Sequence, residues 1–154
     1  MKPSDELNLS FFKADDHNLA SQKLWSAVTS EHLTPEQVAS IPGEKLTFDP
    51  GQIIVAEGDH QVDDMYFVLS GKVYVYKAYQ SPHELMLAIL QPGDLFGEMG
   101  LFLQEPRSAS VVAYDKVTVN RVSKSAVGVL LTHNPHVSVS IITTLCARLK
   151  NVLS

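Results

Sequence analysis

The sequence predicts a mainly β domain, a β-sandwich or barrel, with helices on either side of it. Three observations predict this class: short apolar segments broken by turn residues fill the middle of the chain, helical periodicity precedes and follows them, and 45% of the 154 residues are hydrophobic. That length and composition are enough for one domain with a core of its own. We expect a polar N-terminal lead at residues 1–21 and one folded unit at residues 22–154.

The region ahead of the strands carries two helical signals. The first is an apolar face around Trp25, and the second is Thr34 followed by Pro35 and Gln37. Those three residues fit the N-cap, the first-turn proline and the capping-box partner of a helix. Two short helices are therefore predicted between residues 24 and 41.

Turn residues then separate four strand-like segments, IIVA, MYFVL, KVYVY and LMLAIL. The turns carry glycine at regular intervals: Pro50-Gly51, Glu57-Gly58-Asp59, Ser70-Gly71 and Pro92-Gly93. Short strands at such spacing are typical of a β-sandwich or barrel.

Helical periodicity returns after Lys124, and a long C-terminal helix is predicted from about residue 135, directly after Asn134. Apolar residues recur on one face of it at spacings of three to four: Val137, Ile141, Leu145, Leu149, and Val152 or Leu153. We interpret this stripe as a packing face, with a dimer seam or a ligand lid as a second use. The chain ends inside this helix, which favours a fragment of a longer protein.

Charge and composition argue against two classes of partner. The net charge of -5 is unlike that of a protein that binds nucleic acid directly. The longest apolar runs, MLAIL and VGVLL, are too short to cross a membrane, and the N-terminus lacks a signal-peptide core. The single cysteine, Cys146, is interpreted as a small core residue, which fits a reducing compartment. We therefore expect a cytoplasmic protein without a membrane or nucleic-acid partner.

The segment FGEMGLFLQEPRSASVV, residues 96–112, places two charged residues among the strands, where unpaired charges are rarely buried. Gly97 allows a tight turn, and a short helix beginning near Glu98 would aim free N–H groups at an anion. Arg107 offers a planar fork of donors to two phosphate oxygens, and Ser108 adds a hydroxyl. Glu98 would accept a hydrogen bond from a neutral hydroxyl. A sugar hydroxyl beside a phosphodiester satisfies all of these groups.

These residues resemble the cyclic-nucleotide-binding domains of catabolite-activator-type regulators, kinase regulatory subunits and cyclic-nucleotide-gated channels. FGEMGLF is similar to the opening of that family's phosphate-binding cassette, and EPRSASVV is similar to its close. FDPGQIIVAEGD, MYFVLSGKVYVY and ILQPGDLFGE extend the likeness to roughly Leu24–Val152. The resemblance implies an eight-stranded jelly-roll-like barrel with the nucleotide in its mouth, an N-terminal helical segment and a C-terminal helix.

The resemblance also implies roles for individual residues. Glu98 would bind the ribose 2'-OH, and Arg107 and Ser108 would bind the cyclic phosphate. The turn at Gly97 and the backbone N–H groups of three residues would support them: Met99, Gly100 and Ala109. Base and sugar would lie against five apolar residues: Val75, Leu87, Ala88, Leu90 and Val111. Arg148, near the end of the C-terminal helix, is expected to reach Glu98 or the ribose.

The resemblance to the activator branch favours cAMP as the ligand. It leaves cGMP open, because Ser108 can also help bind a guanine amino group. On its final helix the activator branch has hydroxyl side chains that touch the purine, whereas this sequence has Val152 and Leu153 there. We therefore expect a mostly apolar cover over the base.

Competing functions are less well supported by the residues. A metal-dependent cupin-type enzyme needs a cluster of ligands on adjacent strands, and only His60 and His83 lie in the strand region. A phosphodiesterase needs a metal cluster or a general base near the phosphate, which Glu98 alone does not supply. A DNA-binding regulator needs a recognition helix after the long helix. We expect a non-catalytic sensor that acts through its C-terminal helix, either as a homodimer or on a fused or associated output domain.

Overall fold

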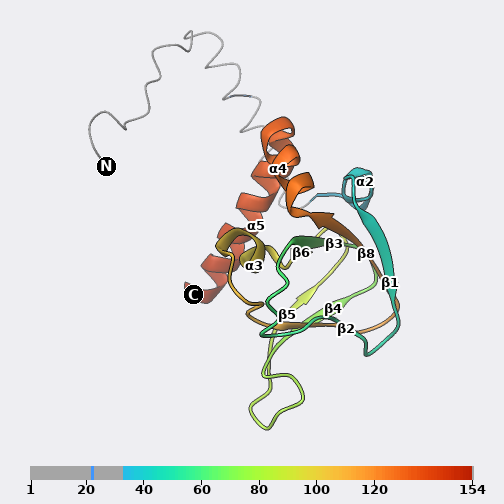
Figure 1. Cartoon of the computed structure of the whole chain (residues 1–154), viewed down its shortest axis with the longest axis vertical. Coiled ribbons are helices and arrows are strands. Elements are labelled where there is room, and N and C mark those ends of the chain that lie inside the picture. Colours follow the sequence, from blue (N-terminus) through green and yellow to red (C-terminus); the bar gives the residue numbers. More distant parts are fainter. Residues whose placement is uncertain (1–21, 23–32, 154) are drawn as a thin grey trace, which may run out of the picture.

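The computed structural model describes Gln22 and residues 33–153. Within this part the chain forms eight strands in two four-stranded antiparallel sheets that face each other (Figure 1), in the orders β1-β8-β3-β6 and β2-β7-β4-β5. Their bounds are β1 Glu44–Phe48, β2 Ile53–Val55, β3 Asp64–Ser70, β4 Val73–Lys77, β5 Leu85–Leu90, β6 Leu95–Phe96, β7 Ser110–Ala113 and β8 Val117–Ser123. The predicted jelly-roll-like, eight-stranded fold is confirmed, as two facing sheets and not as one closed barrel.

Residues 33–153 also form four helices: α2 Pro35–Ser40, α3 Glu98–Leu103, α4 Lys124–His133 and α5 Pro135–Leu153. The capping box predicted for α2 is confirmed, because the Gln37 N–H donates to Thr34 Oγ1 at 3.2 Å and the Thr34 N–H donates to Gln37 Oε1 at 2.9 Å. The predicted helix around Trp25 and the polar lead at residues 1–21 lie outside the described residues.

The four predicted strand segments are confirmed as β2, β3, β4 and β5. The turn between β3 and β4 shows why its glycine is needed. Gly71 has a φ of +80°, and a Cβ there would lie 2.4 Å from the Lys116 carbonyl oxygen. A side chain at this position would therefore meet both backbone strain and a clash.

Two hydrophobic clusters divide the core, and β3 takes part in both. Met65 and Phe67 pack with buried residues of α2, α4 and α5, whereas Tyr66 and Val68 pack in the space between the two sheets. Because side chains alternate along a strand, β3 is buried on both of its faces. The helices are thus held on the outer face of one sheet, and the inner faces of both sheets enclose the second cluster.

Asn120 on β8 ties α2 to this sheet. Its side chain is fully buried, and its amide nitrogen donates to the Val38 carbonyl at 3.1 Å and to the Ile41 carbonyl at 2.8 Å. The Val38 carbonyl also accepts the Ile41 N–H at 3.3 Å, so the amide adds a second donor there and supplies one to Ile41, at the end of the helix where carbonyls lack partners within it. A Cβ at Gly43 would lie 2.2 Å from Asn120 Oδ1, which keeps a glycine beside the amide.

The apolar stripe of α5 packs only along its first half. Val137 and Ile141 are buried in the core, whereas Val152 is 80% and Leu153 is 77% exposed. The interpretation of Cys146 as a core residue is wrong, because its side chain is exposed. At 3.6 residues per turn it lies about 140° around the helix from Ile141, and therefore faces away from the sheets.

Candidate functional site

A cavity of about 860 Å³ lies between the β2-β7-β4-β5 sheet, α3 and the second half of α5. This volume is in the range of small-molecule pockets. Apart from the expected cover by Val152 and Leu153, all thirteen predicted site residues lie in its lining: Val75, Leu87, Ala88, Leu90, Gly97, Glu98, Met99, Gly100, Arg107, Ser108, Ala109, Val111 and Arg148. Most of the polar members lie on α3 and in the segment before β7, with Arg148 on α5, and five of the apolar members lie on strands.

The turn into α3 requires glycine and opens one end of the cavity. Gly97 is the N-cap of α3 with a φ of +82°, and a Cβ there would lie 2.9 Å from Arg107 Nη1. No side chain caps this helix start. The first N–H groups of a helix have no acceptor within it, so those at Met99 and Gly100, which line the cavity, suit an acceptor supplied by a ligand.

Arg107 is held beneath this turn with only 5% of its surface exposed. Its Nη1 donates to the Gly97 carbonyl at 2.7 Å, and its Nη2 donates to Asp64 at 2.7 Å (Oδ1) and 3.1 Å (carbonyl). A guanidinium has five N–H donors. The Nε–H and the second Nη1–H have no acceptor among residues 33–153, so two donors of a fixed, positively charged group remain for an anion.

Asp64, which the sequence analysis missed, is the counter-ion that makes this burial tolerable. It begins β3 and also lies 3.7 Å from Arg121 Nε. The only sequence signal was an acidic residue at the start of the segment that forms β3, 43 residues before Arg107. Asp64 lies close to Arg107 because β3 pairs with β6, the strand that directly precedes Gly97.

Glu98 is also only 5% exposed, and its Oε1 accepts a hydrogen bond from Arg148 Nη1. Arg148 Nη2 donates to the Leu95 carbonyl as well. A buried carboxylate needs such a partner, because its desolvation is otherwise costly. The predicted contact between Arg148 and Glu98 therefore joins α5 to α3 across the cavity, as the close approach of these helices in Figure 1 suggests.

Two neighbouring segments hold the stretch that carries Arg107 and Ser108. The Gly58 N–H donates to the Arg107 carbonyl at 2.8 Å, and the Arg107 N–H donates to the Asp59 carbonyl at 2.9 Å. From the end of β4, Lys77 Nζ donates to the Ser108 carbonyl at 2.7 Å. From the sequence, residues 57–59 are predicted only as a turn, and no role is predicted for Lys77.

Glu57 completes this arrangement. Its Oε1 accepts the Ala78 N–H at 2.8 Å, and its Oε2 lies 3.3 Å from Lys77 Nζ. The Ala78 N–H and, to a smaller extent, the Lys77 ammonium hold the pKa of the Glu57 carboxyl below its usual value, against the opposing effect of burial. The carboxylate is therefore charged at neutral pH.

The other end of the cavity is apolar where strands line it and mixed where α5 covers it. Phe96 lies in the strand lining and stacks on Tyr66, with ring centroids 4.9 Å apart. Val152 lines the cavity as expected, but the expected cover by Leu153 is wrong, since that residue is outside the lining. The helix instead adds polar residues that the sequence analysis missed: Thr144, Lys150 and Asn151. Thr144 and Asn151 lie four before and three after Arg148, on one helical face.

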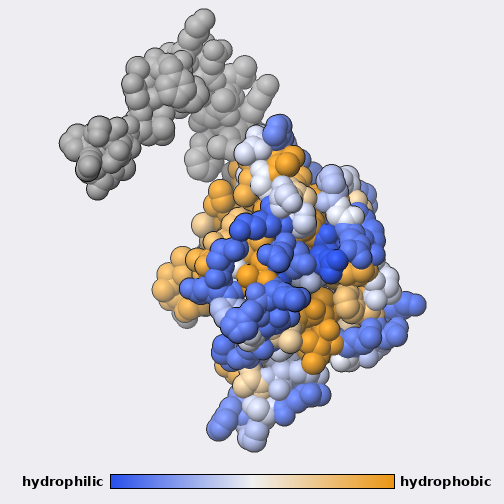
Figure 2. All heavy atoms as spheres, in the orientation of Figure 1, coloured by the Kyte–Doolittle hydropathy of each residue, from blue (hydrophilic) through white to orange (hydrophobic). Residues whose placement is uncertain are grey.

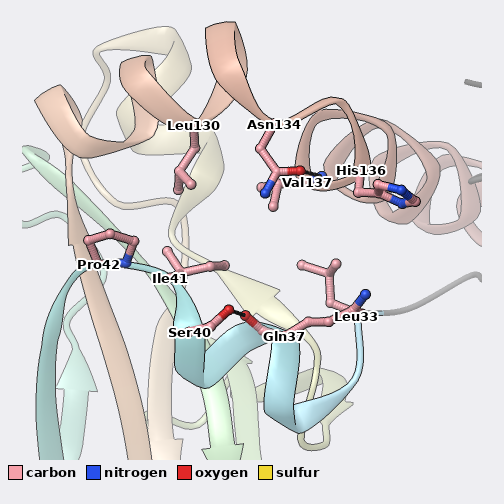
Figure 3. Close-up of a pocket in the computed structure, with 9 residues that line it drawn as sticks. All are labelled: Leu33, Gln37, Ser40, Ile41, Pro42, Leu130, Asn134, His136 and Val137. Atoms are coloured by element: carbon pink, nitrogen blue, oxygen red, sulfur yellow. Dashed lines mark hydrogen bonds between the residues drawn. The ribbon is translucent and has the colours of Figure 1, made fainter.

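A second cavity, of about 150 Å³, lies between α2 and the junction of α4 with α5 (Figure 3). Its polar groups already serve the helices around it. Ser40 Oγ donates to the Gln37 carbonyl at 2.7 Å, and Asn134 Oδ1 accepts the Val137 N–H at 3.3 Å. Across the described part of the chain, no three His, Cys, Asp or Glu side chains come together in a way that would hold a metal ion.

None of the described helices is long and apolar enough to cross a membrane.

Residues 45–134 match the family model of the cyclic nucleotide-binding domain. The chain is 32% identical over 120 residues to the cyclic AMP receptor protein of Thermus thermophilus, covering 77% of this chain and 55% of that protein. It is 27% identical over 118 residues to the CRP-like cAMP-activated global transcriptional regulator of Mycobacterium tuberculosis, covering 75% and 52%. The crystal structure of the Thermus thermophilus catabolite activator protein superposes with a TM-score of 0.63 at 28% identity, covering 88% of this chain and 58% of that one. The chain thus spans about half the length of the curated relatives it matches.

Proposed function

The chain belongs to the cyclic nucleotide-binding domain family, and from this we propose that it is a non-catalytic sensor of a 3',5'-cyclic purine nucleotide, with cAMP the favoured ligand. The observation that carries the proposal is the pair of buried, opposite charges on one cavity wall, Arg107 and Glu98. A buried cation suits a phosphodiester, and a buried carboxylate suits a neutral hydroxyl next to it. A cyclic nucleotide presents both groups on adjacent atoms of one rigid ring system.

In this proposal the cyclic phosphate lies against the remaining donors of Arg107, the Ser108 hydroxyl and the N–H groups of Met99, Gly100 and Ala109. Glu98 Oε2 accepts the ribose 2'-OH, because Oε1 is already engaged by Arg148. The base lies toward the apolar strands and the last turns of α5. Asp64 compensates the buried positive charge of Arg107, yet it leaves some of the N–H donors of Arg107 free for the phosphate.

The base preference is tested by competition between cAMP and cGMP. We expect cAMP to bind more tightly or comparably, since Val152 and the strand residues make mostly apolar contacts, which discriminate poorly between rings of similar shape. A fluorescent cyclic nucleotide displaced by increasing amounts of each unlabelled ligand gives both affinities under the same conditions. A preference for cGMP above about tenfold would assign this chain to a cGMP sensor.

We propose that the output passes through α5. A ligand can shift an element only by binding one of its arrangements better than another. Arg148 links α5 to Glu98 at the edge of the ligand site, so a nucleotide that occupies Glu98 Oε2 changes the surroundings of that link. The exposed hydrophobic side chains at the end of α5 and on α3 form a surface for a second copy of the chain or for an output domain (Figure 2): Met99, Phe102, Leu103, Leu149, Val152 and Leu153.

Hydrogen exchange with and without cAMP tests this coupling. Protection is expected to rise across residues 98–108, because the ligand contacts that segment, and to change across residues 144–153, because α5 is linked to it through Arg148. The Arg148→Ala variant should keep the first effect and lose most of the second. If residues 98–108 become protected while α5 stays unchanged in the wild-type chain, the output runs through another element.

A further inference from the structure

We infer that Lys77 is a positioning residue for phosphate binding: its ammonium fixes the peptide between Ser108 and Ala109 so that the Ala109 N–H points into the cavity. The inference rests on the proposed function and adds to it a residue outside the ligand site. Lys77 Nζ donates to the Ser108 carbonyl at 2.7 Å. Lys77 is absent from the cavity lining, whereas Ser108 and Ala109 both belong to it.

The geometry of a trans peptide makes this contact directional. The C=O and N–H bonds of one trans peptide plane point in opposite directions, and the described residues contain no cis peptide bond. With the Ser108 carbonyl drawn toward Lys77, outside the cavity, the Ala109 N–H of the same plane is turned to the opposite side. A flip of this plane would present a carbonyl oxygen to the phosphate and repel it.

The ammonium also makes the Ala109 N–H a better donor. A cation bonded to a peptide oxygen draws electron density from the amide, and linked hydrogen bonds strengthen one another in this way. Lys77 thus contributes to the phosphate site through an intervening peptide, in contrast to Arg107, whose guanidinium lines the cavity itself.

Glu57 holds Lys77 in this position. The Lys77 side chain is 52% exposed, and an exposed lysine does not keep one conformation without a partner. Glu57 Oε2 lies 3.3 Å from Lys77 Nζ, and Oε1 accepts the Ala78 N–H at 2.8 Å. Ala78 adopts a φ of +53°, a conformation that costs energy in a residue with a side chain. The Glu57 N–H in turn donates to Ser110 Oγ at 3.0 Å, so one glutamate bridges the end of β4 and the start of β7.

The test compares the affinity for cAMP of the wild-type chain with those of three variants, measured by calorimetry. Lys77→Met removes the ammonium, Lys77→Arg keeps a charged donor, and Lys116→Met removes an exposed lysine outside the cavity lining as the charge-matched control. We expect Kd to rise about fivefold to tenfold in Lys77→Met and to stay within about twofold in the other two, as for the weakening, not the complete loss, of the bond from the Ala109 N–H to the phosphate.

The two phosphorothioate diastereomers of cAMP separate positioning from a general loss of structure. Each carries sulfur, a poorer acceptor, in place of one of the two exocyclic phosphate oxygens. The diastereomer whose sulfur faces Ala109 already lacks a good hydrogen bond to the Ala109 N–H. Lys77→Met should therefore lower the affinity for this diastereomer much less than the affinity for the other one. The ratio of the two affinities should therefore shift in this variant, in favour of the diastereomer whose sulfur faces Ala109.

Equal weakening of both diastereomers, or unchanged cAMP affinity in Lys77→Met, would overturn the inference. If Lys77→Met unfolds, Glu57→Gln replaces it: this variant removes the anchoring charge while keeping an oxygen for the Ala78 N–H, and it should shift the diastereomer ratio in the same direction. A wild-type chain that binds neither cAMP nor its phosphorothioates would instead refute the proposed function, an outcome that the wild-type titration alone reveals.

Discussion

Arg107→Ala is expected to weaken the binding of cAMP by at least about tenfold in Kd, because charge-assisted hydrogen bonds to a desolvated phosphate contribute about 1.5–3 kcal/mol or more. The size of the effect follows from preorganisation. Gly97 and Asp64 hold Arg107 without any contribution from the ligand, so its remaining donors need no rearrangement when the ligand binds. Calorimetric titration of both proteins with cAMP measures the difference.

Two further variants serve as controls for this result. Arg107→Lys keeps the positive charge but loses the planar fork, so its affinity should fall between those of the wild type and the alanine variant. Arg121→Ala removes the other arginine near Asp64 without touching the cavity lining, and should bind cAMP with nearly wild-type affinity. Equal affinity of wild type and Arg107→Ala would rule out Arg107 as the phosphate ligand.

Glu98→Gln is expected to produce the second large effect, and one that depends on a single hydroxyl of the ligand. A hydrogen bond from the ribose 2'-OH to a buried carboxylate contributes about 1.5–3 kcal/mol, so the wild-type chain should bind 2'-deoxy-cAMP at least about tenfold more weakly than cAMP. In Glu98→Gln the charge is gone, and the two ligands should bind with much more similar affinities.

The four affinities form a double-mutant cycle between the protein and the ligand. Arg148→Ala is the companion variant, because Glu98→Gln also leaves that arginine without its carboxylate partner. If Arg148→Ala lowers the affinities for cAMP and 2'-deoxy-cAMP by one common factor while Glu98→Gln changes their ratio, the hydroxyl contact belongs to Glu98. A wild-type chain that does not distinguish the two ligands would contradict this role.

The parts of the fold and site that the sequence predicts are those encoded over short distances. The strands follow from short apolar segments between turns that carry glycine, and the capping box of α2 is complete within Thr34–Gln37. The residues that place a cation beside a helix start, Gly97 to Ser108, are also contiguous. Their arrangement therefore depends on local backbone geometry that residue types already restrict.

The groups that support this segment come from elsewhere in the chain and could not be predicted in the same way. Asp64 reaches Arg107 because β3 pairs with β6 in one sheet, and Lys77 reaches Ser108 because β4 pairs with β7 in the other. The buried Asn120 finds the end of α2 about 80 residues away for the same reason. The rotation of α5 likewise depends on packing against the sheet, which is why Cys146 and Leu153 face solvent and Asn151 joins the cavity.

The central claim is that the cavity between α3, α5 and the β2-β7-β4-β5 sheet binds a cyclic nucleotide through its phosphodiester and its ribose. The most direct measurement is a calorimetric titration of the wild-type chain with 3',5'-cAMP and, under the same conditions, with 5'-AMP, which has the same base and sugar but an open phosphate and a free 3'-OH. The account predicts saturable binding of one cAMP per chain and a far lower affinity for 5'-AMP, because only the cyclic ester holds the phosphate against Arg107 while the 2'-OH meets Glu98. Absence of cAMP binding, or equal affinity for the two nucleotides, would contradict it.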